Sequence, residues 1–169
     1  MVGTGEDGQG DWAQMKDLAR QFQCLSAAQK RLVHIQLCKQ ALQKWHAYLK
    51  LQKRIHYVDS VVGTHQEVDV SLPDDALASA RGGRDLANVQ RRYLEPIAAI
   101  QDSDLKFPEE ITYAYYSLCN LFRRYCLADE IDDWLIVNQA ISAEINQDQW
   151  TRNLKHVLTD AVTPAARTT

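Results

Sequence analysis

One segment of the chain, residues 27–57, contains neither glycine nor proline and repeats its apolar residues at helical spacing. At its start, Ser26 and Gln29 have the form of a capping box, in which each side chain satisfies the other residue's backbone amide. The apolar stripe consists of Leu32, Ile35, Cys38, Leu42, Trp45 and Leu49. It is widened by Leu37, Ala41 and Tyr48. A helix with so wide an apolar face must contact several other helices. The segment therefore predicts an all-α fold, an irregular bundle around a long second helix.

The rest of the chain divides into further helices and one long loop. Start signals and apolar periodicity predict helices at 11–24, 73–80, 84–100, 108–127, 129–145 and 146–162. Pro96 must kink or split the helix at 84–100, so we expect six or seven helices in all. The loop near 58–72 is rich in β-branched residues, which are compatible with a short extended piece. With Gly 7 and Pro 4, the chain has too little turn chemistry for an all-β fold.

Besides the long second helix, four of the predicted helices have a largely apolar stripe that should face the core. The N-terminal helix has Trp12, Met15, Leu18, Ala19 and Phe22, and the helix at 108–127 has Ile111, Tyr115, Leu118, Cys119, Phe122 and Cys126. The last two helices have Ile131, Trp134, Leu135, Asn138, Ile141 and Ile145, and then Trp150, Leu154, Val157, Leu158 and Ala161. Side chains at this spacing lie on one side of a helix.

The length of 169 residues indicates one domain with its own core. We expect a disordered leader at 1–10, a single helical domain at 11–162 and a disordered tail at 163–169. No apolar stretch is long enough to span a membrane, and the acidic, glycine-rich start lacks the pattern of a secretory signal. A cytoplasmic location is therefore the default, in which the four cysteines act as small core residues.

The residue patterns of common catalytic, metal and phosphate sites are missing from the sequence. His34 and Cys38 are the one His/Cys pair at helical spacing, but apolar residues surround them. The five histidines lack metal-ligand spacing, and the glycines at 82–83 lack a phosphate-loop pattern. The net charge of −3 is too mild for general nucleic-acid binding. We therefore expect no enzyme activity, no catalytic residue, no metal, no other cofactor, and no nucleic-acid or membrane partner.

Two surface features favour a protein partner instead. Tyr113 and Tyr116 lie one turn apart on a different helix face from the core stripe, and tyrosine is favoured at interfaces. The second feature places four carboxylates beside an indole: Asp129, Glu130, Asp132, Asp133 and Trp134. Core packing of the tyrosines and pairing of the carboxylates with a helix dipole are the structural alternatives. The predicted partner-binding surface comprises these seven residues.

Three segments carry a resemblance to a known class of proteins. They are Leu94-Glu-Pro-Ile-Ala-Ala-Ile-Gln-Asp-Ser-Asp-Leu, Phe107-Pro-Glu-Glu-Ile-Thr-Tyr-Ala-Tyr-Tyr-Ser-Leu and Asp132-Asp-Trp-Leu-Ile-Val-Asn-Gln-Ala. In helix pattern they resemble small all-helical bacterial immunity proteins of polymorphic or contact-dependent toxin systems. The resemblance contains no diagnostic motif, so it transfers no functional residue. It implies a non-catalytic protein that binds and neutralises a cognate toxin.

Two other functions stay open at this stage. The first is a structural or adaptor role, including a homodimer formed through the long second helix. The second is an RNA-processing enzyme, since Arg31 with His34 and Arg152 with His156 pair a cation with a histidine about one helical turn away. Neither pair keeps the spacing of helical RNA-cleaving toxins.

Overall fold

The computed structural model describes residues 7–52, 54–59, 62–82 and 106–163, with side chains from Trp12 onward. Within these ranges the chain forms six helices and one two-stranded sheet, which confirms the predicted all-α irregular bundle. The helices are α1 (Asp7–Gln23), α2 (Ala27–Leu49), α3 (Leu72–Gly82), α5 (Glu109–Cys126), α6 (Asp133–Ser142) and α7 (Gln147–Val162). The strands are β1 (His56–Val58) and β2 (His65–Glu67).

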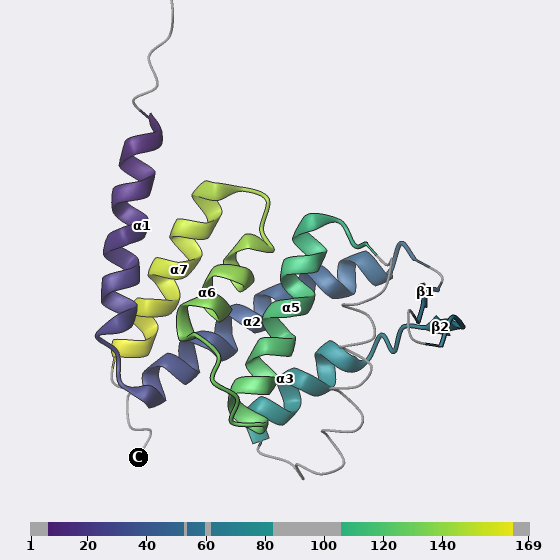
Figure 1. Cartoon of the computed structure of the whole chain (residues 1–169). Helices are drawn as coiled ribbons and strands as arrows, with labels where there is room; N and C mark the ends of the chain where they lie inside the picture. The colour runs from purple at the N-terminus through teal and green to yellow at the C-terminus, as the bar shows by residue number, and fades with distance from the viewer. Residues whose placement is uncertain (1–6, 53, 60–61, 83–105, 164–169) are drawn as a thin grey trace, which may run out of the picture.

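Helix α2 lies at the centre of the bundle and contacts α3, α5, α6 and α7, as its wide apolar face predicts (Figure 1). The predicted capping box is present, because the side chain of each of Ser26 and Gln29 accepts a hydrogen bond from the backbone amide of the other. Trp45 is fully buried, and its indole N–H donates to the Val70 carbonyl at 3.1 Å. This bond fixes the segment before α3 against the central helix.

The predicted end of the second helix at residue 57 is wrong, because α2 ends at Leu49. After it the chain turns back, and Ile55 and Val68 are both buried and joined by a 2.8 Å backbone hydrogen bond. If the helix continued to residue 57, the Ile55 carbonyl would not accept the hydrogen bond from the Val68 amide. Tertiary packing therefore overrides the helical pattern of these residues.

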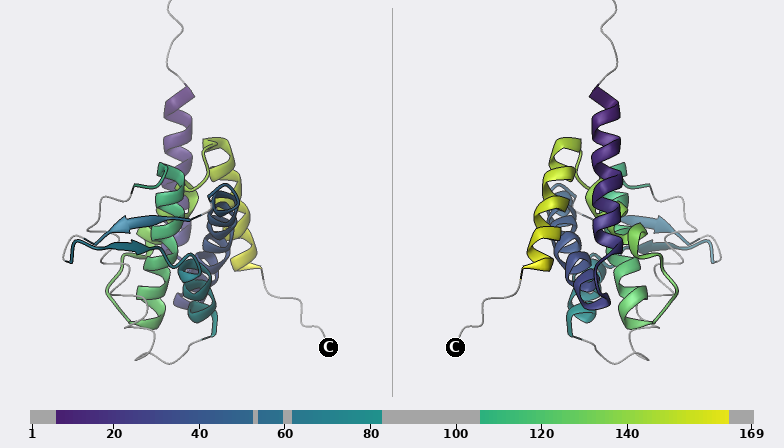
Figure 2. Two further views of the ribbon diagram at one scale, coloured as in Figure 1. Left: turned by 90° about the vertical axis from the view of Figure 1, so that its right-hand side faces the viewer. Right: turned by 90° about the vertical axis from the view of Figure 1, so that its left-hand side faces the viewer.

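The predicted loop near 58–72 contains a β-hairpin. Strands β1 and β2 are antiparallel, with Tyr57 opposite Gln66. The connection turns at Gly63, whose φ of 69° favours glycine, and the Asp59 side chain accepts a hydrogen bond from the Val62 amide. The hairpin and α1 lie at opposite ends of the bundle (Figures 1 and 2).

Helix α1 starts at Asp7, so it begins before the predicted residue 11 and includes four residues expected in the leader. Its predicted stripe is only partly correct. Leu18 and Phe22 are buried, but Trp12 is 65% exposed. Figure 1 shows that the start of α1 rises above the other helices that the structure describes.

Helix α6 is shorter than predicted. It begins at Asp133 with Asp132 as its N-cap, in place of the predicted start at Asp129, and it ends at Ser142. Its buried residues are Ile136, Val137, Ala140 and Ile141, whereas the predicted Leu135 and Ile145 are exposed. The face that meets α2 and α5 is thus rotated from the predicted stripe. The same error applies to Leu32 of α2, which is exposed while Val33 and His34 are buried.

The core stripe of α5 is confirmed in full, and Leu154, Val157 and Leu158 of α7 are buried as predicted. Asn146 caps α7, also as predicted. The predicted helix at 84–100 and its Pro96, residues 1–6 of the leader and 164–169 of the tail lie outside the described residues. None of the helices described is long and apolar enough to cross a membrane.

Candidate functional site

The structure divides the predicted partner-binding surface into two separate regions. Tyr113 and Tyr116 lie in the first half of α5, whereas the acidic segment from Asp129 to Asp133 follows the end of that helix. Between Tyr113 and the helix end at Cys126, the α-helical rise of 1.5 Å per residue gives roughly 20 Å. The tyrosines and the acidic segment therefore do not form one continuous patch.

Most of the acidic segment has structural partners. Asp129 forms an ion pair with Arg123 at 2.9 Å, and the Asp132 side chain accepts from the Leu135 amide as the N-cap of α6. Asp133 contacts both Arg124 and Lys30, at 3.2 and 3.7 Å. In the part of the chain that the structure describes, Glu130 is the one carboxylate of this segment with neither an ion pair nor a capping role. The segment's charge is largely compensated within the fold.

The three aromatic residues of the predicted surface, Tyr113, Tyr116 and Trp134, also make core contacts. Trp134 is half-buried and packs against Phe22 of α1, with ring centroids 5.7 Å apart. Tyr116 is half-buried with its ring edge-to-face on Tyr115, at a centroid distance of 5.7 Å. Burial raises the pKa of Tyr116. Tyr113 in addition lies at an open pocket.

This pocket, which we call the acidic–aromatic groove, lies where α5 begins, α6 ends and α7 begins. Its volume is ≈ 290 Å³ and its lining consists of Glu109, Glu110, Tyr113, Ser142, Glu144, Ile145 and Trp150. Three carboxylates, two aromatic rings and an isoleucine that is 78% exposed therefore meet at one open surface. Tyrosine and tryptophan are enriched among the residues that contribute most to binding at protein interfaces.

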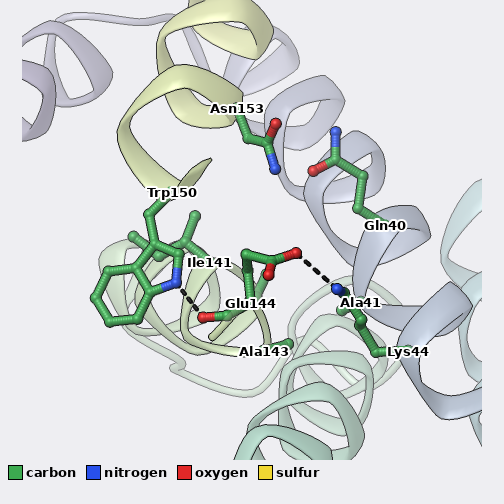
Figure 3. A pocket seen from close by; sticks show the side chains of 9 residues that line it. Gln40, Ala41, Lys44, Ile141, Ala143, Glu144, Trp150 and Asn153 are labelled. Atoms are coloured by element: carbon green, nitrogen blue, oxygen red, sulfur yellow. Dashed lines mark hydrogen bonds and ion pairs between the residues drawn. The ribbon is translucent and has the colours of Figure 1, made fainter. Parts of the chain in front are cut away.

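One wall of the groove is fixed by Glu144, in the turn between α6 and α7. Its carboxylate pairs with Lys44 of α2 at 2.6 Å and accepts hydrogen bonds from the backbone amides of Ile145 and Asn146. Its main-chain oxygen accepts the indole N–H of Trp150. In Figure 3 the Glu144 side chain lies between the Trp150 ring and Lys44. The hydrogen bond from Lys44 is the main cause that holds the pKa of Glu144 below its usual value, against the opposite effect of burial.

Glu144 and Trp150 also line a second, smaller pocket on the α2 side (Figure 3). Gln40, Lys44 and Asn153 contribute its polar groups, and its volume is ≈ 20 Å³. A space of that size holds about one water molecule. The smaller pocket shares Glu144 and Trp150 with the groove, and it is too small for a ligand of its own.

The other wall of the groove carries two carboxylates that have no ion-pair partner among the described residues. Glu109 and Glu110 form the first turn of α5, where the helix dipole stabilises carboxylates. Since Lys44 already neutralises Glu144, the two glutamates of α5 give the groove its net negative charge.

Of the seven residues that line this site, sequence reasoning nominated Tyr113 and missed the other six: Glu109, Glu110, Ser142, Glu144, Ile145 and Trp150. Ile145 and Trp150 were predicted to face the core, because both fit the apolar periodicity of their helices. The available signal was the N-cap Asn146 between them, since residues at a helix junction often leave the stripe that the helix interior follows. Nothing in the sequence singles out Glu144, whose role depends on Lys44 from a distant segment.

The one His/Cys pair at helical spacing, which was set aside as a catalytic pair on sequence grounds, is enclosed in the core. His34 is fully buried, with Nδ1 2.7 Å from the Tyr125 hydroxyl and Nε2 2.8 Å from the main-chain oxygen of Asp133. Burial raises the pKa of the Cys38 thiol to about 12, so the thiol stays protonated. Over the described ranges, no group of three or more His, Cys, Asp or Glu residues is placed to hold a metal ion.

The residues nominated for RNA processing are engaged with other groups of the fold. Arg31 donates to the Ala80 carbonyl at 2.6 Å and stacks over the Tyr125 ring. His156 is exposed and lies 3.6 Å from Asp160, while Arg152 bonds to Gln149. Both pairs are thus engaged with neighbouring groups. The acidic–aromatic groove combines aromatic, aliphatic and acidic side chains at one open surface, so it is able to contact another molecule. Comparison with protein family models, with curated proteins and with solved structures finds no match to this chain.

Proposed function

We propose that this protein is a non-catalytic protein-binding module, and that it serves as an immunity protein that binds and neutralises a cognate toxin. The observation that carries the proposal is the acidic–aromatic groove, which joins exposed Ile145, partly exposed Tyr113 and Trp150, and the carboxylates of Glu109 and Glu110. Protein interfaces have this composition, with aromatic and aliphatic anchors at the centre and polar groups around them.

The rigidity of the groove supports the same proposal. Lys44 and Glu144 join α2 to the α6–α7 turn, and the indole of Trp150 is held by the Glu144 main chain. Because these contacts exist without a partner, binding would not have to order this wall first. A preorganised surface suits the tight binding that toxin neutralisation requires.

The structural alternative, a homodimer through the second helix, has less support. All the buried side chains of α2 lie within a bundle in which four helices contact it. Leu32 is the large α2 hydrophobic with more than half of its surface exposed. One such side chain provides much less apolar area than a stable dimer interface needs.

The proposal is tested by capture and by toxicity in the same cells. Tagged full-length protein is used as bait in lysate of the source cell, in parallel with the groove variant Glu109→Lys/Glu110→Lys and the control Glu130→Lys. We expect a stoichiometric partner with wild type and control and much less with the groove variant. The captured protein is then expressed alone and with the wild-type chain.

Growth arrest by the captured protein, relieved by the wild-type chain, is the expected result. A captured protein without toxicity would overturn the immunity role and leave a binding module. Bait recovered alone, or only as an oligomer of itself, would overturn the binding module as well. Circular dichroism of each variant verifies that the helices are intact.

A further inference from the structure

We infer that the acidic–aromatic groove receives an arginine side chain from a basic segment of the partner. The inference rests on the proposed binding function and specifies the chemistry of the partner at that site. It follows from three features of the groove lining: its negative charge, its two aromatic rings and its exposed aliphatic side chain.

The charge of the lining selects a cation. Glu109 and Glu110 lie on successive positions of α5, and in the described structure neither has an ion-pair partner, whereas Glu144 is already paired with Lys44. A partner that placed carboxylates or only apolar groups here would add repulsion or leave these charges desolvated without a partner. A cationic side chain is complementary to both glutamates.

The aromatic rings favour arginine over lysine. Tyr113 and Trp150 line the groove and are partly exposed, and the Trp150 N–H is already used by the Glu144 main chain. The Trp150 ring therefore remains to contact a ligand, while its N–H is occupied. A guanidinium group stacks on aromatic rings and donates two parallel hydrogen bonds to a carboxylate, whereas an ammonium is a compact and strongly hydrated charge.

The exposed isoleucine accounts for the rest of the side chain. Ile145 is 78% exposed in the lining of the groove. The methylene stem of an arginine covers apolar surface of this kind while its head stays at the carboxylates. One arginine therefore satisfies the apolar, aromatic and acidic parts of the groove together.

The test uses ¹⁵N-labelled full-length protein, titrated with a tetra-arginine peptide and observed by NMR. The controls are a tetra-citrulline peptide, which keeps the shape without the charge, and a tetra-lysine peptide. We expect shifts of the Trp150 indole and Tyr113 amide signals with tetra-arginine, weaker ones with tetra-lysine and none with tetra-citrulline. The spectrum of Trp150→Phe assigns the indole signal.

Two matched variants locate the contact. Glu109→Gln/Glu110→Gln should raise the Kd of tetra-arginine by roughly fivefold or more, the effect of losing two partly exposed ion contacts. Glu130→Gln, at an exposed carboxylate of the other acidic region, should leave the Kd unchanged. Equal binding of tetra-citrulline or tetra-lysine, shifts confined to residues 129–133, or an unchanged Kd in the double variant would overturn the arginine site. The capture experiment decides separately whether the protein has a partner, so the two failures are distinguishable.

Discussion

The Nε2 atom of His34 lies 2.8 Å from the main-chain oxygen of Asp133, and this contact joins α2 to the first residue of α6. A carbonyl oxygen only accepts, so Nε2 carries the proton. Nδ1 is then the acceptor for the Tyr125 hydroxyl at 2.7 Å, and the ring is neutral. Burial is the main cause that lowers the pKa of His34 to about 4, opposed by its hydrogen bond to Asp133 and by the Asp133 carboxylate. Arg124 and Lys30 lower the pKa further.

Stability should fall as the pH drops from 6.5 toward 4. In this window His34 takes up a proton in the unfolded chain but not in the folded one, so acid favours unfolding. The shift from 6.5 to about 4 corresponds to about 3 kcal/mol of unfolding free energy, lost fully below the lower value. Urea unfolding of wild type and His34→Gln across this range measures the contribution. The variant should show a shallower dependence, and the exposed His156→Gln should match wild type; equal slopes for wild type and His34→Gln would contradict the account.

Replacing Tyr115 by phenylalanine should not destabilise the protein. Among the described residues, its hydroxyl is the one buried side-chain polar atom without a hydrogen-bond partner, and burial raises its pKa strongly. A buried hydroxyl without a partner costs about 1–3 kcal/mol, so removing it should be neutral or stabilising while the ring keeps its contacts with Trp45 and Phe107. The midpoint of urea unfolding measures the effect. A loss of stability in Tyr115→Phe would show that the hydroxyl has a partner.

Asp132→Ala should cost about 1 kcal/mol, because it removes the N-cap of α6. Glu130→Ala, two residues earlier and exposed, should change the unfolding free energy by less than about 0.5 kcal/mol. Chemical denaturation of both variants makes the comparison. Equal stability of the two would contradict the structural role that the fold assigns to Asp132.

Glu144→Ala should loosen the turn between α6 and α7. The variant loses the ion pair with Lys44 and the acceptor for the amides of Ile145 and Asn146. Native-state hydrogen exchange at these amides should become faster, while exchange in α2 stays near the wild-type rate. Asp148→Ala, at an exposed carboxylate of the first turn of α7, is the matched control. Unchanged exchange at Ile145 would remove Glu144 as the support of the groove wall.

The parts of the fold that the sequence predicted well depend on local chemistry. The capping box at Ser26, the cap at Asn146 and the apolar stripe of α5 were all predicted, because spacing and side-chain type determine them. Errors arose where distant segments decide. Ile55 leaves the helical pattern to meet Val68, and the buried face of α6 follows the positions of α2 and α5.

The candidate site was predicted less well for the same reason. Tyr113 was correctly singled out as a residue off the core stripe, and it lines the groove. Of the carboxylates predicted for the same surface, Asp129 and Asp133 pair with Lys30, Arg123 and Arg124. Only tertiary structure brings Glu144, Ile145 and Trp150 to the beginning of α5. Glu109 and Glu110, in the first turn of that helix, had not been predicted as binding residues.

The most direct test of the central claim is the affinity of the captured partner for matched variants of the chain. Isothermal titration at low salt compares wild type with Glu109→Lys/Glu110→Lys in the groove and with Glu130→Lys outside it. Charge reversal at a complementary contact costs several kcal/mol, so the groove variant should bind at least tenfold more weakly while the control retains the wild-type Kd. Equal Kd values for wild type and groove variant, with intact helicity in both, would contradict the claim that the acidic–aromatic groove is the binding surface.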